Sequence, residues 1–316
     1  MQSFLKFLLL IAAGTAFGQP YPSKPVHLVV AFPPGGPVDI IARLITPRMS
    51  EALGQPIVVE NKTGASGNLA AAQVAKSAAD GYTILAHSSA YAVNASLFAD
   101  PGYDAQKDFI PVAVVASQPN LILVNAEFPA RSLAELLQMA RAQKLAFASP
   151  SSGTTPHLTA ENLFRVRAKV DITHVPFRGA GPAAAAVLGG EPPIGSMAGT
   201  APMPHIKSGK LRALAVSSSK RLASLPDVPT LTELGYSDME DYTWVGLFLP
   251  AGTPVGIAQK VNDAVLRSVQ GPDLRERLDA LAFDVTAAPL RETADYVKSE
   301  LVKWAKVVRD TGAKAE

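Results

Sequence analysis

The stretch AFPPGGPVDIIAR, Ala31–Arg43, places three prolines and two glycines between an apolar run and a segment of helical character. The run before it, VHLVV at Val26–Val30, predicts a short buried strand. Pro37 suits the first position of a helix, and Asp39 suits its first turn, where an acidic side chain complements the helix dipole. We therefore expect a strand, a tight glycine turn and a helix that continues until Gly54 ends it.

The same order of strand, glycine-rich turn and helix recurs in VVENKTGASGNLAAAQVA (58–75) and in AFASPSSGTTPHLTAENLF (146–164). In the latter, Thr155 is expected to cap the helix, with Pro156 at its first position. The first N–H groups of a helix have no partner within it, and together with the helix dipole they favour an anion. Three such turns suggest an anion-binding cleft, although helix capping alone would also explain them.

Strand-like and helix-like segments alternate along most of the chain. Further strands are expected at IVVE, YTILA, LILV, LAFA, ITHV and LRALAV. This alternation predicts a parallel or mixed sheet with helices on both faces. Polar and proline-rich residues interrupt it at SQPNL (117–121) and SSSKRLASLPDVPT (217–230), which indicates two crossings between two domains. We expect domain 1 to comprise residues 19–121 and 225–316, and domain 2 to comprise residues 122–224.

The composition is that of a globular protein, and the N-terminal residues predict export. The 316 residues are 48% hydrophobic and 18% charged, and the net charge of +2 is too small to favour a nucleic-acid partner. Residues 1–18 hold a lysine, an apolar stretch and small residues, which predicts a signal peptide cut after Gly18; the stretch is shorter than the roughly 20 residues of a membrane anchor. The chain has no cysteine, hence no disulfide and no site for a lipid anchor. We expect it in the periplasm of a Gram-negative bacterium, with full secretion as the alternative.

Common catalytic motifs are missing. The turns carry neither GxxxxGK[ST] nor GxGxxG, and the chain has no GxSxG. His157 and Glu161 lie one helical turn apart without a third ligand nearby, so neither a metal site nor a cofactor is expected. Ser88, Ser89 and Ser151 lie at expected turns and favour hydrogen bonding over nucleophilic catalysis.

Over nearly its full length the chain resembles the substrate-binding proteins of tripartite tricarboxylate transporters, also called Bug proteins. The resemblance is carried by segments that include YPSKPVHLVVAFPPGGPVDIIAR, GQPIVVENKTGASGN, SSGTTPHL, ITHVPFRGAGPA, LPDVPTLTELGY and WVGLFLPAGTP. It implies an α/β protein with the two-domain periplasmic-binding-protein fold, type II-like, and a ligand cleft between the domains. It also implies a small organic carboxylate as ligand, held by backbone N–H groups, hydroxyls and waters, and delivery of that ligand to a membrane permease.

The resemblance places the ligand-binding residues of this chain in five segments. They are Phe32, Pro34, Gly35, Gly36 and Asp39 in the first turn, Ala65, Ser66, Gly67 and Asn68 in the second, Ser88 and Ser89 after the third strand, Ser151, Gly153, Thr154, Thr155 and His157 in the third turn, and Arg178, Gly179 and Ala180 beyond it. Pro37 stands where the family usually has a residue with an N–H, so one donor is missing. The segment GEPPIGSMAGTAPMP (190–204) departs from the family pattern and is expected to face the cleft.

The sequence therefore favours a periplasmic solute-binding protein without enzymatic activity. We expect N–H and hydroxyl donors around Gly153 and Thr154 to hold the carboxylate, with Arg178 as the nearest cationic candidate. A side chain at Gly153 is expected to fill the place of the ligand. Two alternatives stay open: an exported input protein that binds the same ligand class and feeds a sensor kinase, or, less favoured, a hydrolase with a loop serine and one of the five histidines.

Overall fold

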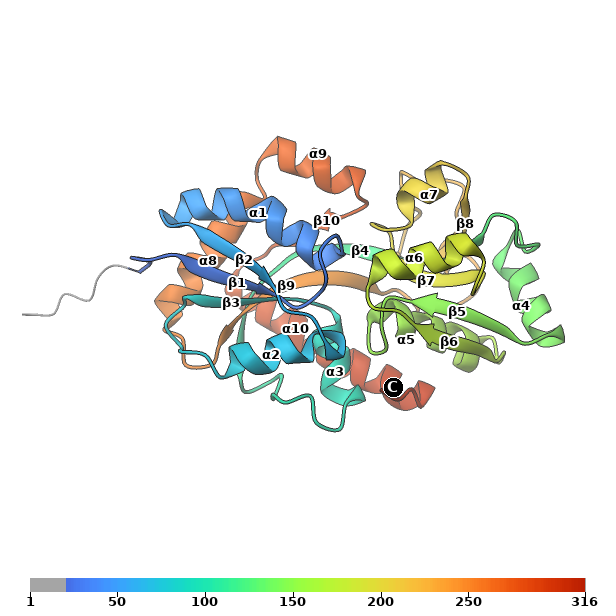
Figure 1. The fold of residues 1–316 in the computed structure, drawn as a ribbon, viewed down its shortest axis with the longest axis horizontal. Helices are drawn as coiled ribbons and strands as arrows, with labels where there is room; N and C mark the ends of the chain where they lie inside the picture. Colours follow the sequence, from blue (N-terminus) through green and yellow to red (C-terminus); the bar gives the residue numbers. More distant parts are fainter. Residues whose placement is uncertain (1–20, 316) are drawn as a thin grey trace, which may run out of the picture.

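The computed structural model describes residues 21–315, which form two α/β lobes joined by long strands (Figure 1). The predicted signal peptide, residues 1–18, lies outside the described residues. The strands are β1 (Val26–Val30), β2 (Ile57–Asn61), β3 (Thr83–Ser88), β4 (Phe109–Asn125), β5 (Leu145–Ser149), β6 (Ile172–Pro176), β7 (Ile194–Ala198), β8 (Leu211–Val216), β9 (Tyr242–Pro250) and β10 (Asp284–Val285). The helices are α1 (Pro37–Leu53), η1 (Ala65–Gly67), α2 (Asn68–Ala75), α3 (Ala90–Leu97), α4 (Leu133–Ala142), α5 (Thr155–Glu161), η2 (Asn162–Arg167), α6 (Ala180–Gly189), α7 (Met203–Lys207), α8 (Val255–Ser268), α9 (Pro272–Ala280) and α10 (Leu290–Thr311).

The first lobe is built on a mixed sheet with helices on both faces, as the sequence predicted. Its strands follow the order β2–β1–β3–β9–β4, in which β1 pairs in parallel with β2 and β3, and β9 runs antiparallel between β3 and β4. Side chains of a strand alternate between its faces. Leu28 and Val30 of β1 pack in the cluster that includes residues of α1 and α8, whereas Val29 packs in the cluster that includes residues of α2, α3 and α10. The first lobe therefore has a hydrophobic core on each side of its sheet.

The second lobe repeats this arrangement on a smaller sheet. Strands β6, β5 and β7 are parallel to one another, and β7 and β8 both pair antiparallel with β4. Ile122 and Val124 of β4 pack in the cluster that includes α4 and α5, whereas Leu121 and Leu123 pack in the cluster that includes α6. The sheets of both lobes are therefore buried on both faces.

Strand β4 joins the two lobes without interruption. Its first part, Phe109–Pro119, pairs with β9 of the first lobe, and its last residues pair with β7 and β8 of the second. The sequence predicted a strand only at Leu121–Val124, with a break at 117–121, and it predicted neither β7 nor β9. Pro119 does not break β4 because it stands where the strand exchanges its partners, so that the missing N–H removes little from either ladder.

The packing of the segment between β8 and β9 is relevant to where the chain returns from the second lobe to the first. Leu231 and Met239 pack in the same cluster as Ile122 and Phe147 of the second lobe. The chain then re-enters the first lobe as β9, which begins at Tyr242. We expected the second domain to end at residue 224; from this packing we propose that the crossing lies near Asp241 instead.

The helix boundaries follow local sequence signals, with one correction. Helix α1 begins at Pro37 and ends at Gly54, whose φ is 72°, as predicted. Thr155 was expected to cap α5, but the cap is Thr154, and Pro156 is the second helical residue. The Thr155 hydroxyl instead bonds to side chains of other elements. Among residues 21–315, none of the helices combines the length and the apolar character that a membrane crossing requires.

Candidate functional site

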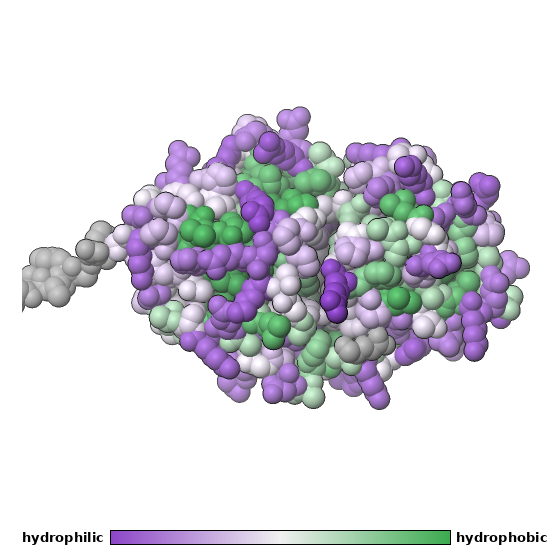
Figure 2. Space-filling view, in the orientation of Figure 1, coloured by the Kyte–Doolittle hydropathy of each residue, from purple (hydrophilic) through white to green (hydrophobic). Residues whose placement is uncertain are grey.

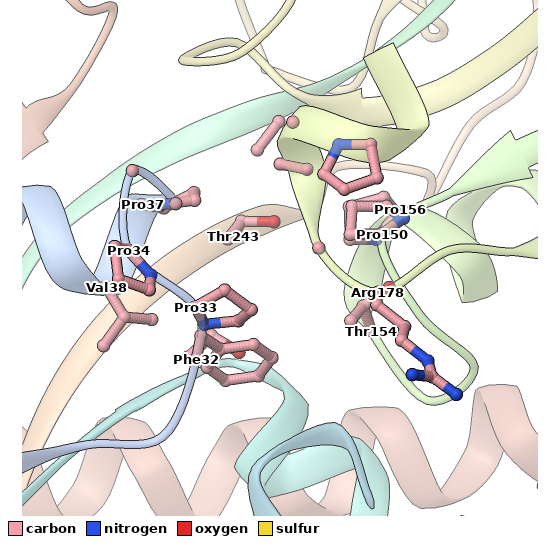
Figure 3. Close-up of a pocket in the computed structure, with 18 of the residues that line it drawn as sticks. Phe32, Pro33, Pro34, Pro37, Val38, Pro150, Thr154, Pro156, Arg178 and Thr243 are labelled. Atoms are coloured by element: carbon pink, nitrogen blue, oxygen red, sulfur yellow. The ribbon is translucent and has the colours of Figure 1, made fainter. Parts of the chain in front are cut away.

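A cavity of about 170 Å³ lies between the two lobes, in the furrow that Figure 2 shows between them. Figure 3 shows its two walls and its back: Phe32, Pro33, Pro34, Pro37 and Val38 on one side, Pro150, Thr154 and Pro156 on the other, and Thr243 of β9 between them. The first wall is the loop before α1, and the second wall combines the loop before α5 with the start of α6. The cavity therefore draws on both lobes and on a strand that joins them.

The first wall is fixed by Asp39. The N–H of Gly35, at φ 80°, donates to Oδ2 of Asp39 over 3.0 Å, and Oδ1 accepts from Arg43 and Asn61 over 2.9 Å each. Burial opposes ionisation of Asp39, but the hydrogen bonds from Arg43, Gly35 and Asn61 together lower its pKa. Both carboxylate oxygens are thus bonded within the protein, and Asp39 lies behind the wall rather than on it.

The second wall is fixed by a pair of histidines. The N–H of Gly153, also at φ 80°, donates to Nδ1 of His157 over 3.2 Å. The His157 ring stacks on His174 with 3.9 Å between ring centres, and Nε2 of His174 bonds to the Ser149 hydroxyl over 2.7 Å. Burial lowers the pKa of His157 to about 3 and that of His174 to about 4, so both rings are neutral and Nδ1 of His157 can accept.

Gly153 faces α3 rather than the cavity. A Cβ built on it would approach Oδ1 of Asn94 to 2.6 Å and a methyl group of Leu97 to 2.9 Å. This corrects the expectation that a side chain at Gly153 would fill the place of the ligand. Substitution there would disturb the packing between the lobes instead.

A chain of hydroxyls runs behind the cavity. The hydroxyl of Thr243 donates to Oδ1 of Asn120, so it must accept from Thr155, 2.8 Å away, and Thr155 in turn must accept from Ser89, 2.9 Å away. Asn120 then donates to Oδ1 of Asp241 over 2.7 Å. Because a hydroxyl carries one hydrogen, Thr155 and Thr243 have none left to offer a ligand.

A second cavity, of about 430 Å³, adjoins the first and shares Phe32 and Arg178 with it. Ser66 and Ser151 line this second cavity, and their hydroxyl oxygens lie 2.7 Å apart. Ser66 also donates to the carbonyl oxygen of Ser152, so the Ser151 hydroxyl is the donor between the two serines. These bonds join η1 of the first lobe to the loop before α5 of the second.

Few donors remain free around the main cavity. The Ser88 hydroxyl accepts from the N–H of Ala90, and its own hydrogen has no acceptor among the described residues. The N–H groups of Val38 in α1 and of Ala180 and Gly181 in α6 belong to first helical turns, where no carbonyl of the same helix can accept them. Arg178 is the one charged side chain among the described residues that line this cavity, and Figure 3 shows its guanidinium directed away from Thr243.

The residues expected at the site fall into three groups. Those that line the main cavity are Phe32, Pro34, Gly35, Gly36, Ser88, Thr154, Thr155, Arg178, Gly179 and Ala180. Those that line the second cavity without reaching the first are Ala65, Ser66, Gly67 and Ser151. Those that lie behind the walls are Asp39, Asn68, Ser89, Gly153 and His157. Their role in ligand binding stays a prediction.

Sequence reasoning missed several lining residues. Pro150 and Pro156 lie within the third turn and could have been included with it. Thr243 of β9 has no local signal, because that strand was not predicted, and β7, which carries Ala198, was not predicted either. Ala198 comes from the divergent segment 190–204, which was expected to face the cleft.

Ser88 lines the main cavity and Ser151 the second, but no hydrogen bond joins either hydroxyl to a histidine ring among the described residues. Ser149 bonds to His174, but Ser149 is fully buried and lines neither cavity. The lowered pKa of His174 also makes it a weak base. Within residues 21–315, no three His, Asp or Glu side chains come close enough together to hold a metal ion.

Comparison with known proteins shows the family of the chain. Residues 41–313 match the model of the tripartite tricarboxylate transporter family receptor. Protein BugT of Bordetella pertussis is 37% identical over 93% of this chain and 91% of its own. A protein of R. palustris solved with adipate is 33% identical, with a TM-score of 0.88 over 94% of this chain and 100% of its own. MatC from Rhodopseudomonas palustris, solved with bound malate, is 36% identical, with a TM-score of 0.85 over 91% of this chain and 100% of its own. The chain belongs to the tripartite tricarboxylate transporter receptor family, whose members are solute-binding proteins.

Proposed function

We propose that this protein captures a small organic carboxylate between its lobes and delivers it to a membrane permease of the tripartite tricarboxylate type. One observation carries the proposal: α1 and α6, from different lobes, both begin at the cavity with free N–H groups. A helix N-terminus favours an anion through these groups and through its dipole. A hydrogen bond to an ionised group contributes about 1.5–3 kcal/mol, so a few of them support micromolar binding, which corresponds to roughly −8 kcal/mol.

The proposal includes a periplasmic location and no enzymatic activity. The signal-like residues 1–18 and the absence of cysteine support export to the periplasm of a Gram-negative bacterium. The burial of Ser149 and the neutral, stacked state of His157 and His174 support binding without turnover. The adipate and malate in the two solved relatives support a carboxylate as the ligand class.

A pair of substitutions at Ala180 tests the role of the helix N-termini. Ala180→Pro removes the N–H at the first position of α6, where proline suits the helix backbone, whereas Ala180→Val adds a side chain of similar size and keeps the N–H. We expect calorimetric titration, with a carboxylate that the unmodified protein binds, to show an affinity at least tenfold lower for Ala180→Pro than for Ala180→Val. Equal affinities would count against an anion held by α6.

Delivery to a permease needs a test in cells. Deletion of the gene is expected to reduce uptake of the radiolabelled carboxylate that the purified protein binds, and a plasmid copy should restore it. The Ala180→Pro variant should restore less uptake than Ala180→Val. Uptake that does not depend on the gene would contradict a transport role.

A further inference from the structure

The walls of the main cavity contain few groups that can bond to a polar substituent. Six of its lining residues are prolines, which have no N–H: Pro33, Pro34, Pro37, Pro150, Pro156 and Pro182. The carbonyl oxygens of Pro33, Pro150 and Pro156 already accept from Gly36, Gly179 and Ser196, respectively. Val38 and Ala198 add apolar side chains. A hydroxyl group of a ligand that enters this cavity therefore loses its bonds to water and finds few replacements.

The hydroxyls of the protein do not change this balance. Thr154 donates to the carbonyl of Ser151 over 2.8 Å, and Thr155 and Thr243 belong to the chain of bonds behind the cavity. Ser88 is the lining side chain whose hydroxyl hydrogen has no acceptor among the described residues. One hydroxyl donor and the N–H groups of two helices suit a carboxylate. Arg178, whose guanidinium is directed away from Thr243, and the remaining lone pairs of the threonine hydroxyls are the few groups left for a second polar group on the body of the ligand.

The second cavity cannot supply the missing groups. Ser66 and Ser151 are bonded to each other there, as described above. Pro33 and Gly179, from different lobes, line both cavities, and a Cβ built on Gly179 would lie 3.5 Å from Cγ of Pro33. The groups that surround a small ligand in the main cavity are therefore mainly those of the proline-lined walls.

The cavity also lacks a partner for a cationic group. Among residues 21–315, neither an aspartate nor a glutamate lines it. The nearby carboxylate of Asp39 is occupied by Gly35, Arg43 and Asn61. An ammonium group in the cavity would therefore be desolvated without a counter-charge, which is costly.

From these walls we infer the class of ligand: a carboxylate whose body is unsubstituted hydrocarbon, aliphatic or aromatic, without hydroxyl or amino groups. This inference rests on the proposed function, because it assumes that a carboxylate is bound. It separates this chain from a receptor for hydroxylated acids or for amino acids. The apolar walls contribute by burying the hydrocarbon, and the helix N-termini with Ser88 hold the carboxylate.

Matched acids that share a carbon skeleton test the inference by calorimetric titration of the purified protein. The probes are succinate, malate and aspartate; hexanoate, 2-hydroxyhexanoate and 2-aminohexanoate; and benzoate with 3-hydroxybenzoate. We expect the unsubstituted member of each bound set to be favoured over its hydroxylated partner by about ten- to hundredfold, and over its amino partner by more. Hydroxylated or amino acids that bind as tightly as their parents would overturn the inference while the proposed function stands. Binding of none of the probes at millimolar concentration would overturn both.

A substitution that adds a hydroxyl to the wall should weaken this preference. Val38→Thr keeps the shape of the side chain at the cavity, and Val58→Thr makes the same change at an exposed position of β2. We expect Val38→Thr to reduce the preference for the unsubstituted acid at least threefold, with no change in Val58→Thr. If Val38→Thr does not fold, Ala198→Ser adds a hydroxyl to the lining from β7 of the second lobe and serves the same purpose. A preference that is unchanged in a folded wall variant would contradict the assignment of these walls to the ligand body.

Discussion

The two loops that face each other across the cavity share a backbone design but differ in the charge of the group that fixes them. Gly35 and Gly153 both have φ of 80°, and each donates its N–H to a side chain four residues further along. In the first lobe the acceptor is Asp39, an anion that also bonds to Arg43 and Asn61. In the second lobe the acceptor is His157, a neutral ring.

This difference determines how each wall responds to pH. Hydrogen bonds lower the pKa of Asp39, so its carboxylate keeps its charge and its bond to Gly35 in moderate acid. Nδ1 of His157 can accept from Gly153 only while it is unprotonated. The folded protein keeps both bonds in moderate acid. Below pH 6.5, however, protonation of His157 favours the unfolded chain, whereas the corresponding effect of Asp39 begins only near its ordinary pKa of 3.8.

We expect the largest loss in the free energy of unfolding at acid pH. Burial lowers the pKa of His157 to about 3 and those of His87 and His174 to about 4, from an ordinary value of 6.5. Below pH 6.5 the unfolded chain therefore binds protons that the folded chain does not, so stability is highest above that pH and falls as the pH drops toward 4. Buried Asp241, with its pKa raised to about 6, acts in the opposite direction but is one group against three. We expect urea titrations to show a loss on the order of 4 kcal/mol in the free energy of unfolding between about pH 6.5 and about pH 4.5.

Two substitutions test how much of that loss in stability comes from His157 of the second wall and whether Asp39 of the first wall contributes to it. His157→Asn keeps an acceptor near the position of Nδ1 and removes a titrating group. It should lower the net fall over this pH range by about half, since Asp241 offsets one of the three histidines and one of the other two is gone. Asp39→Asn should leave the fall unchanged, because Asp39 is already ionised in this range. A His157→Asn variant with the pH dependence of the unmodified protein would contradict this account.

The next largest loss of stability is expected from substitution of Asp39, which fixes the first wall. Asp39→Ala leaves the N–H of Gly35 without its acceptor and removes one of the two acceptors of the Asn61 amide. We expect a loss of about 3 kcal/mol in the free energy of unfolding at neutral pH, measured by urea titration. Asp39→Asn retains one acceptor oxygen and should cost about half as much. Equal losses in the two variants would show that the size of the side chain matters here rather than its hydrogen bonds.

The smallest loss of stability is expected from removal of the hydrogen bonds that Ser66 makes between the lobes. Ser66→Ala removes the bonds to Ser151 and Ser152 that join the lobes, which should cost about 1 kcal/mol and shift the balance toward an open form by about fivefold. Small-angle scattering without ligand should then give a larger radius of gyration. Ser77→Ala, which removes a hydroxyl-to-carbonyl bond within one lobe, is the control. The same change in both variants, or in neither, would argue against a bond that holds the lobes together.

Features that depend on neighbouring residues could be predicted from the sequence. Pro37 and Gly54 marked the ends of α1, because proline suits a first helical turn and glycine adopts the left-handed conformation that ends a helix. The alternating environments of Leu28 and Val29 follow from the period of a strand, and they fit the predicted sheet with helices on both faces. The similarity to a receptor family was likewise visible in contiguous segments, and the family is confirmed.

Which of the expected site residues reach the cavity depends instead on how distant segments meet in the folded chain. Ser151 and Thr155 both carry hydroxyls in one glycine-rich turn, yet Ser151 bonds to Ser66 and Thr155 bonds to Thr243, partners that lie 85 and 88 residues away. Pro119 lies within a continuous strand because β4 changes partners there, which no local pattern reveals. The physical reason is the same in each case: a backbone turn is set by the conformational preferences of a few adjacent residues, whereas the partner of a hydroxyl or of a strand is set by the segments that folding brings beside it.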